Sequence, residues 1–145
     1  MVDDDEEALA HVRDVFATGG PRGRDRAIRE LASALGYARV GRRVRERMDG
    51  LIRAAVRRGI LDNANGELSP LCRSITEYTR DHLITMLLAA MGQGWWHRDK
   101  AINAAARHIG FRRTGSEIRK AFKSAINGAI RRMEVEYDGE WIRRV

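Results

Sequence analysis

The sequence predicts a mostly helical protein made of two tandem winged-helix-like units, each with three helices followed by a β-hairpin. Three observations support this fold class. The chain repeats itself at an offset of 74 residues, apolar residues recur at helical spacing in each half, and each half ends in a hairpin-turn sequence. We therefore expect one unit over residues 1–70 and a second over residues 71–145, joined near Ser69-Pro70-Leu71.

The internal repeat is visible when residues 25–63 are placed over residues 99–137 without a gap. Twelve of the 39 pairs are identical, and glycines as well as arginines recur in the same order, which a shared composition alone does not explain. The identical pairs include Gly36/Gly110, Arg39/Arg113, Gly41/Gly115 and Arg45/Arg119. Shifting the offset by one residue then aligns the turn Asn65-Gly66 with Asp138-Gly139.

The first unit is predicted to hold three helices and a hairpin. A helix around residues 8–16 ends at Gly19-Gly20-Pro21, a second spans about 24–35, and a third spans about 41–58. Asn65-Gly66 is a favoured type I′ hairpin turn, so a strand is expected on either side of it.

The second unit follows the same order. Ser74 and Glu77 have the spacing of a capping box, so the first helix of this unit is expected to begin there and to end near Met91. Helices over about 99–109 and 116–132 follow, and a hairpin turns at Asp138-Gly139.

The second unit has two further apolar features. Residues 83–91, from Leu83 to Met91, are apolar over a broad arc, and we expect this helix to pack between the units or in a homodimer. Trp95-Trp96 precedes the second helix of the unit. We expect one of these tryptophans to be largely buried against residues 83–91; the alternative is stacking on single-stranded bases.

The residues that most often carry chemistry form no recognisable site. The four histidines lie far apart, Cys72 has no histidine within several residues, and the glycine pairs lack the Lys-Ser/Thr of a phosphate-binding loop. A single cysteine also allows no intrachain disulfide. We therefore expect no enzymatic activity, no cofactor and no metal.

The start of the chain and its hydropathy predict a cytoplasmic protein that does not enter a membrane. Residues 3–7 are all acidic, whereas a signal peptide begins with basic residues. The longest apolar run, 83–91, has nine residues including Thr85, and a membrane-spanning helix needs about 20.

Basic charge is concentrated in the predicted third helix of each unit. Residues 39–58 contain eight arginines against Glu46 and Asp49, and residues 112–132 contain seven basic residues against Glu117, so each stretch has a net charge of +6. The whole chain has a net charge of +7, so the remainder is acidic. In helix-turn-helix proteins this helix enters the major groove of DNA, and arginine can pair with guanine edges or phosphates.

The sequence therefore predicts that double-stranded DNA is the partner and that the third helices contact it. The alternative for these helices is a solvated basic face that contacts nothing. The candidate contact residues lie in or just before these helices: Arg39, Arg42, Arg43, Arg45 and Arg53 in the first unit, and Arg112, Arg113, Ser116, Arg119, Lys120 and Lys123 in the second.

Arg45 and Arg119 are the matched candidates, because arginine persists at both positions while neighbouring residues differ between the copies. Two roles fit this pattern. The side chains contact nucleic acid, or they form salt bridges to Asp25 and Asp99, which are also shared between the copies.

Both predicted hairpins are acidic, which opposes contact with phosphates. The acidic residues are Asp62 and Glu67 in the first hairpin and Glu134, Glu136, Asp138 and Glu140 in the second. Either the helices bind DNA alone with the hairpins turned away, or the second unit binds protein. The second reading of the whole chain is a protein-interaction adaptor of the same fold, whose basic faces dock an acidic partner. RNA binding is a weaker alternative, since no aromatic-rich RNA-binding motif is present.

The segments around the shared glycines resemble a small uncharacterised winged-helix-like module attached to some large bacterial superfamily-one helicase–nuclease proteins. The shared pattern is Gly-aromatic-x-Arg-x-Gly-x-x-aliphatic-Arg, beginning at Gly36 and at Gly110, and with the helix and hairpin after it covers about 45 residues in each unit. The chain itself contains no helicase or nuclease motif. The resemblance therefore implies a prokaryotic, nucleic-acid-processing context and not an activity.

Overall fold

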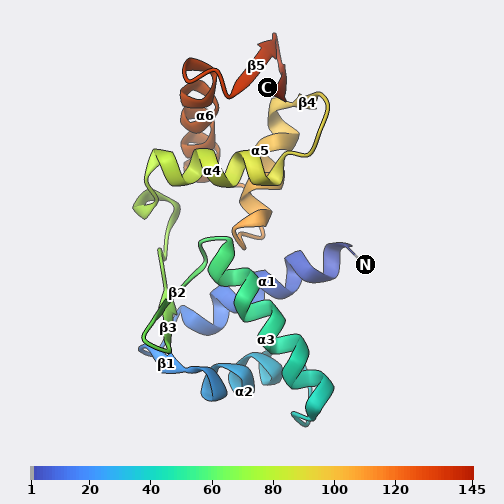
Figure 1. Cartoon of the computed structure of the whole chain (residues 1–145), viewed down its shortest axis with the longest axis vertical. Coiled ribbons are helices and arrows are strands. Elements are labelled where there is room, and N and C mark those ends of the chain that lie inside the picture. The colour runs from blue at the N-terminus through green and yellow to red at the C-terminus, as the bar shows by residue number, and fades with distance from the viewer. Residues whose placement is uncertain (1) are drawn as a thin grey trace. The chain divides into compact units, whose positions relative to one another are not determined.

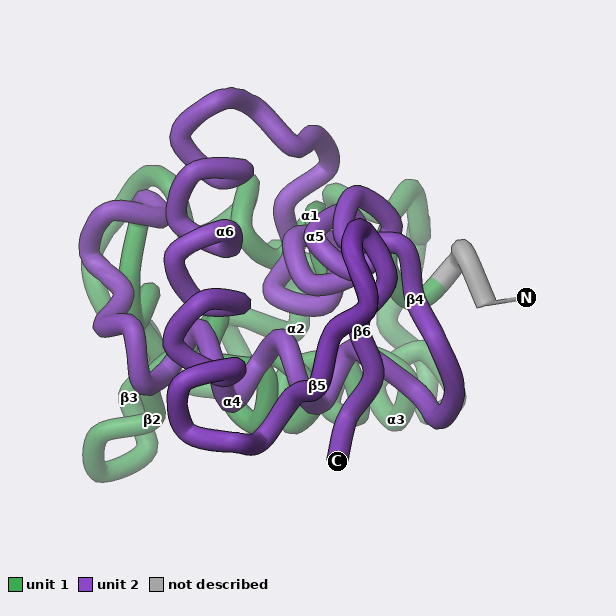
Figure 2. The backbone as a smooth tube through the Cα atoms, turned by 90° about the horizontal axis from the view of Figure 1, so that it is seen from above, with its two compact units in different colours: residues 1–73 green, residues 74–145 purple. Residues whose placement is uncertain are grey.

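A computed structural model describes residues 2–145, with side chains from Asp5 onward. The chain forms two compact units, Met1–Arg73 and Ser74–Val145, which Figure 2 shows in different colours. Each unit has the order helix, short strand, helix, helix and two-stranded hairpin. The fold class is thus confirmed: the protein is mostly helical and consists of two similar winged-helix-like units.

The first unit consists of three helices and a small antiparallel sheet (Figure 1). Its helices and strands are α1 (Val2–Phe16), β1 (Arg22–Gly23), α2 (Arg24–Ala34), α3 (Arg42–Arg57), β2 (Leu61–Ala64) and β3 (Glu67–Pro70). The strand order in the sheet is β1-β3-β2. Side chains from all three helices and from the hairpin share one core, which includes Phe16, Leu31, Ile52, Leu61 and Leu68.

The second unit repeats this arrangement (Figure 1). It contains η1 (Ile75–Glu77), α4 (Arg80–Ala90), β4 (Trp96–His97), α5 (Arg98–His108), α6 (Ser116–Arg131), β5 (Val135–Asp138) and β6 (Trp141–Arg144). The strand order is β4-β6-β5, which matches the first sheet. Buried residues of this unit include Leu87, Ile102, Phe122, Ile126 and Ile142.

A short strand between the first and second helices is the element that sequence reasoning missed. β1 and β4 are each two residues long, too short for strand periodicity to be seen. They exist because they pair with the last strand of their unit: Arg22 is opposite Leu68, and Trp96 is opposite Ile142. This third strand completes the winged-helix sheet.

The hairpin registers correct the predicted shift in the repeat. The strands β5 and β6 follow β2 and β3 at the same offset of 74, so no one-residue shift occurs. Asn65 and Gly66 both have positive φ, 54° and 88°, which confirms the type I′ turn. In the second hairpin Asp138 pairs with Trp141, so the two-residue loop is Gly139-Glu140. Gly139 has a φ of 62°, and glycine at this first position is what a type II′ turn requires.

The shared glycines at the ends of the second helices have a structural cause. Gly36 and Gly110 have φ values of 92° and 84°, a region that residues with a Cβ disfavour. The next residue closes a Schellman motif: the amide of Tyr37 donates to the carbonyl of Ala32, and that of Phe111 donates to Ala106, both at 2.9 Å. This turn directs the chain into the third helix in both units.

The first helix of the second unit begins later than predicted. Ser74 and Glu77 do interact, since the Ser74 amide donates to the Glu77 carboxylate at 3.0 Å, but they cap the short η1 helix. Tyr78 is extended, and α4 begins at Arg80 with Thr79 as its N-cap. The capping box was therefore correct as a local motif and wrong as the start of the long helix.

Trp95 is not the buried tryptophan that the sequence predicted. Trp95 is 45% exposed and Trp96 is only partly buried. Trp96 lies in β4, at the position that the buried Arg22 occupies in the first unit, and Trp95 lies just before it, at the position of the exposed Pro21. The guanidinium of Arg143 lies over the Trp95 ring, 4.7 Å from its centroid.

Helix α4 packs against α5 and α6 within its own unit. Its buried side chains are Leu83, Ile84, Met86 and Leu87. The homodimer expected through this helix stays a prediction. No helix in the described part of the chain is long and apolar enough to cross a membrane.

Candidate nucleic-acid interface

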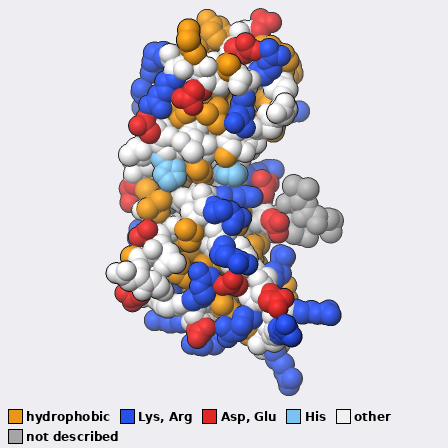
Figure 3. Space-filling view, viewed as in Figure 1, with side chains coloured by type: hydrophobic (Ala, Val, Ile, Leu, Met, Phe, Trp, Pro, Cys, Tyr) orange, Lys and Arg blue, Asp and Glu red, His pale blue; other side chains and the backbone are white. Residues whose placement is uncertain are grey.

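The third helix of each unit has one buried face and one exposed face. In α3 the buried residues are Met48, Leu51, Ile52 and Ala55, and in α6 they are Phe122, Ala125, Ile126, Gly128 and Ala129. The opposite side of each helix is polar, and Figure 3 shows Lys and Arg side chains gathered over the part of the first unit that contains α2 and α3. All predicted contact residues except Arg119 are exposed, and the Arg119 side chain is 35% exposed.

In the first unit, most of the predicted contact arginines pair with carboxylates of the same unit. Arg42 lies 3.3 Å from Glu46 and Arg53 lies 3.5 Å from Asp49, both along α3. Asp49 also accepts a hydrogen bond from Arg24 at the start of α2. Two other candidates, Arg39 and Arg43, are exposed and have no ion pair within the described residues.

In the second unit, the predicted contact lysines are not paired in this way. Lys120 and Lys123 are exposed on α6 with no ion pair to a described residue, and the same is true of Arg113 just before the helix. Arg112 and Ser116 are exposed as well. The two third helices therefore differ in how far their positive charge is already neutralised.

One ion pair is identical in the two units. Arg45 donates to Asp25 at 2.9 Å, and Arg119 donates to Asp99 at 3.0 Å. Each pair ties the first turn of the third helix to the first turn of the second helix. The structure thus contains the salt bridge that was one of the two roles proposed for these arginines.

Replacing Arg45 or Arg119 with alanine should lower the free energy of unfolding by about 0–1 kcal/mol each, because exposed ion pairs contribute little. Thermal unfolding of the single variants, with Asp25→Ala and Asp99→Ala in double-mutant cycles, measures this coupling. The salt dependence of DNA binding should stay unchanged in the double alanine variant if the ion pair is the role of these residues. A log–log salt slope that falls by about 1 per arginine would instead identify phosphate contacts.

The wing of the second unit is partly neutralised by its own arginines. Arg143 pairs with Glu136 across the hairpin, and Arg132 lies 4.0 Å from Glu134. Asp138 and Glu140 stay exposed near the tip of the hairpin. This wing therefore presents mixed charge and not a basic surface.

A groove of about 390 Å³ lies between α5, α6 and the tip of this wing. It is lined by Arg98, Asp99, Ile102, Lys123, Ile126, Asn127, Gly139 and Glu140. Arg98 does not reach across the groove to α6. It donates instead to the carbonyl of Gly139 at 3.1 Å and lies 5.7 Å from the centroid of the Tyr137 ring.

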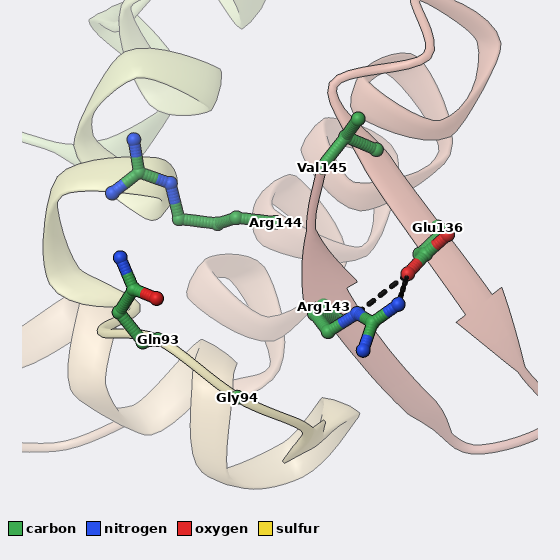
Figure 4. Close-up of a pocket in the computed structure, with 6 residues that line it drawn as sticks. All are labelled: Gln93, Gly94, Glu136, Arg143, Arg144 and Val145. Carbon is green, nitrogen blue, oxygen red and sulfur yellow. Dashed lines mark hydrogen bonds and ion pairs between the residues drawn. The ribbon is translucent and has the colours of Figure 1, made fainter.

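A second hollow, of about 610 Å³, lies between the loop before β4 and the hairpin (Figure 4). It is lined by Gln93, Gly94, Glu136, Arg143, Arg144 and Val145. Figure 4 shows the Arg143 guanidinium turned toward the Glu136 carboxylate, while the Arg144 side chain extends along the other side of the hollow. The lining combines two arginines with one carboxylate, that of Glu136, which is paired with Arg143.

Two further titratable side chains of the second unit, Asp81 and His97, accept hydrogen bonds within the fold. The Asp81 carboxylate, in the first turn of α4, accepts a hydrogen bond from Arg132, and this bond and the negative charge raise the pKa of the Arg132 guanidinium. His97 caps α5, since its Nδ1 accepts from the amide of Asp99 at 3.2 Å. Among the residues described, no three His, Cys, Asp or Glu side chains are grouped so that they could hold a metal ion.

The most consequential side chain that sequence reasoning missed is Arg22. It is 3% exposed and lies over the Phe16 ring at 4.4 Å. Its guanidinium donates to the carbonyls of Val15, Thr18 and Gly20 and to the Glu30 carboxylate. No periodicity or spacing signals a buried arginine inside Pro21-Arg22-Gly23, because its partners are all within eight residues but only the turn after α1 directs their carbonyls toward it.

Comparisons with known proteins identify no relative: no protein-family model matches the chain, and no curated protein or solved structure shows significant similarity to it.

Proposed function

We propose that this protein is a non-catalytic, tandem winged-helix protein that binds double-stranded DNA through the exposed faces of its third helices. The observation that carries the proposal is that both units turn a polar, basic face of the third helix away from the core, in the fold position that enters the major groove in helix-turn-helix proteins. The basic charge of the chain is concentrated on these two segments.

The chemistry of the exposed side chains suits a duplex. Arginine and lysine can contact phosphates or guanine edges, and asparagine and serine can hydrogen-bond to base edges in the major groove. Arg39, Arg43, Arg112 and Arg113 precede or begin the third helices, where helix N-termini also favour phosphate. The wings are acidic, so we propose that they point away from the phosphate backbone.

An adaptor that docks an acidic protein is the second candidate function. The ion pairs along α3 favour it, because arginines already paired with Glu46 and Asp49 are less available to phosphates. The acidic hairpins favour it as well, since they would repel a nucleic acid. The localisation proposed for either function is the cytoplasm of a prokaryote, in keeping with the resemblance to the helicase-associated module.

Binding to arbitrary duplex DNA distinguishes these functions. We expect the full chain to bind a fluorescently labelled duplex in an anisotropy titration, with affinity that falls steeply as salt rises, by a log–log slope of about −0.9 for each phosphate contacted. Single-stranded DNA and RNA of the same sequence should bind more weakly. An absence of duplex binding at low salt would contradict the proposal and favour the adaptor.

A further inference from the structure

We infer that the two units have unequal roles in the proposed DNA binding: α6 of the second unit makes the principal contacts, through Lys120 and Lys123, and α3 of the first unit does not. This inference rests on the proposed function and names the part of the interface that performs it. The internal repeat makes it testable, because every position of one helix has a counterpart in the other at the same offset of 74.

The first step compares the line of residues that runs along the exposed side of each third helix. In α3 this line is Arg42, Glu46, Asp49 and Arg53, whose charges cancel and which form the ion pairs Arg42–Glu46 and Arg53–Asp49. In α6 the same positions hold Ser116, Lys120, Lys123 and Asn127, which carry two positive charges and no carboxylate.

The consequence for DNA follows from the placement of these charges. A phosphate or base edge approaching the middle of α3 meets Glu46 and Asp49, and it must displace a carboxylate from each paired arginine. At α6 the same approach meets lysines that have no ion pair to any carboxylate in the described part of the chain. Serine and asparagine at the flanking positions add donors and acceptors that can read base edges.

The second step concerns the space beside each helix. In the first unit Arg24 reaches from the start of α2 to Asp49 and ties that side of α3 to its own fold. In the second unit the counterparts, Arg98 and Lys123, are both cations and cannot pair. Arg98 turns to the wing, and Lys123 and Asn127 line the groove of about 390 Å³ beside α6.

The carboxylates near α6 do not neutralise Lys120 and Lys123 in the way that Glu46 and Asp49 neutralise the arginines of α3. Glu117 lies in the first turn of α6, where the helix dipole favours an acid, and no described cation pairs with it. Asp99, which lines the groove, is paired with Arg119 at 3.0 Å. Glu140 is exposed near the tip of the wing, at the other side of the groove.

The test uses two charge-matched variants of the full chain. Lys120→Glu with Lys123→Asp installs in α6 the residues that α3 carries, and Arg39→Glu with Arg43→Glu reverses two exposed arginines of the first unit that have no ion pair to a described residue. Each variant lowers the formal net charge by four, from +7 to +3, so the long-range attraction to DNA falls equally in both. All four positions are exposed, and circular dichroism checks that both variants fold.

The expected result is a loss of duplex affinity of about 100-fold in the α6 variant, corresponding to roughly tenfold for each lost contact, and a much smaller loss in the first-unit variant. Equal losses in the two variants, or a larger loss in the first-unit variant, would overturn the unequal roles and leave DNA binding intact. If the unaltered chain binds no duplex, the proposed function itself fails. If the charge reversal unfolds the chain, the neutral variant Lys120→Gln with Lys123→Gln replaces it. This variant should also lower the duplex affinity, but by a smaller factor.

Discussion

Replacing Arg22 with methionine should lower the free energy of unfolding of the first unit by about 3 kcal/mol. The guanidinium satisfies three backbone carbonyls at and after the end of α1, those of Val15, Thr18 and Gly20, at 3.2, 2.6 and 3.1 Å. Methionine keeps an apolar side chain but has no donor, so these part-buried carbonyls would lose their partner and the interaction with the Phe16 ring would disappear.

The measurement can assign the loss to one unit. All three tryptophans lie in the second unit, so tryptophan fluorescence reports that unit while far-ultraviolet circular dichroism reports helices of both. In a urea titration the Arg22 variant should shift the dichroism transition. Arg26→Met is the matched control: Arg26 also pairs with Glu30, but it is 58% exposed, so its loss should cost less than about 1 kcal/mol. Equal effects of the two substitutions would contradict the structural role of Arg22.

Replacing Phe122 with alanine should destabilise the second unit by about 4 kcal/mol, the largest effect that we expect from a single substitution. Phe122 is completely buried on the inner face of α6, in the three-helix core of its unit. Truncation removes most of its apolar surface from the core and leaves a cavity that the rigid helices cannot close.

The repeat supplies the control for this prediction. Met48 occupies the equivalent position in the first unit and is equally buried, so Phe122→Met tests a side chain that the fold already accommodates there. This variant should cost less than about 1.5 kcal/mol, because methionine fills much of the same volume. Urea titration followed by tryptophan fluorescence measures both variants. A cost below about 2 kcal/mol for the alanine variant would show that Phe122 is not a central core residue.

Features that depend on local chemistry and on periodicity could be predicted from the amino-acid sequence. The repeat, three helices in each unit, the glycines Gly36 and Gly110 after the second helices and the Asn65-Gly66 turn were all predictable, because each is caused by residues close together in the chain. The buried faces of the third helices were predictable for the same reason, since apolar residues recur at helical spacing.

Other features could be recognised only in the folded protein. β1 and β4 are strands only because the final strand of each unit, far along the chain, pairs with them. The partners of Arg22 are close in sequence, but Arg22 is buried only because the turn after α1 places the carbonyls of Val15, Thr18 and Gly20 around its guanidinium. The candidate interface was likewise only partly predictable from the sequence. The basic third helices could be predicted. The ion pair between Asp49 and Arg24, which are 25 residues apart in the chain, could not, and the equivalent residue Lys123 is a cation that cannot form it. An ion pair depends on distance in space, which periodicity does not encode.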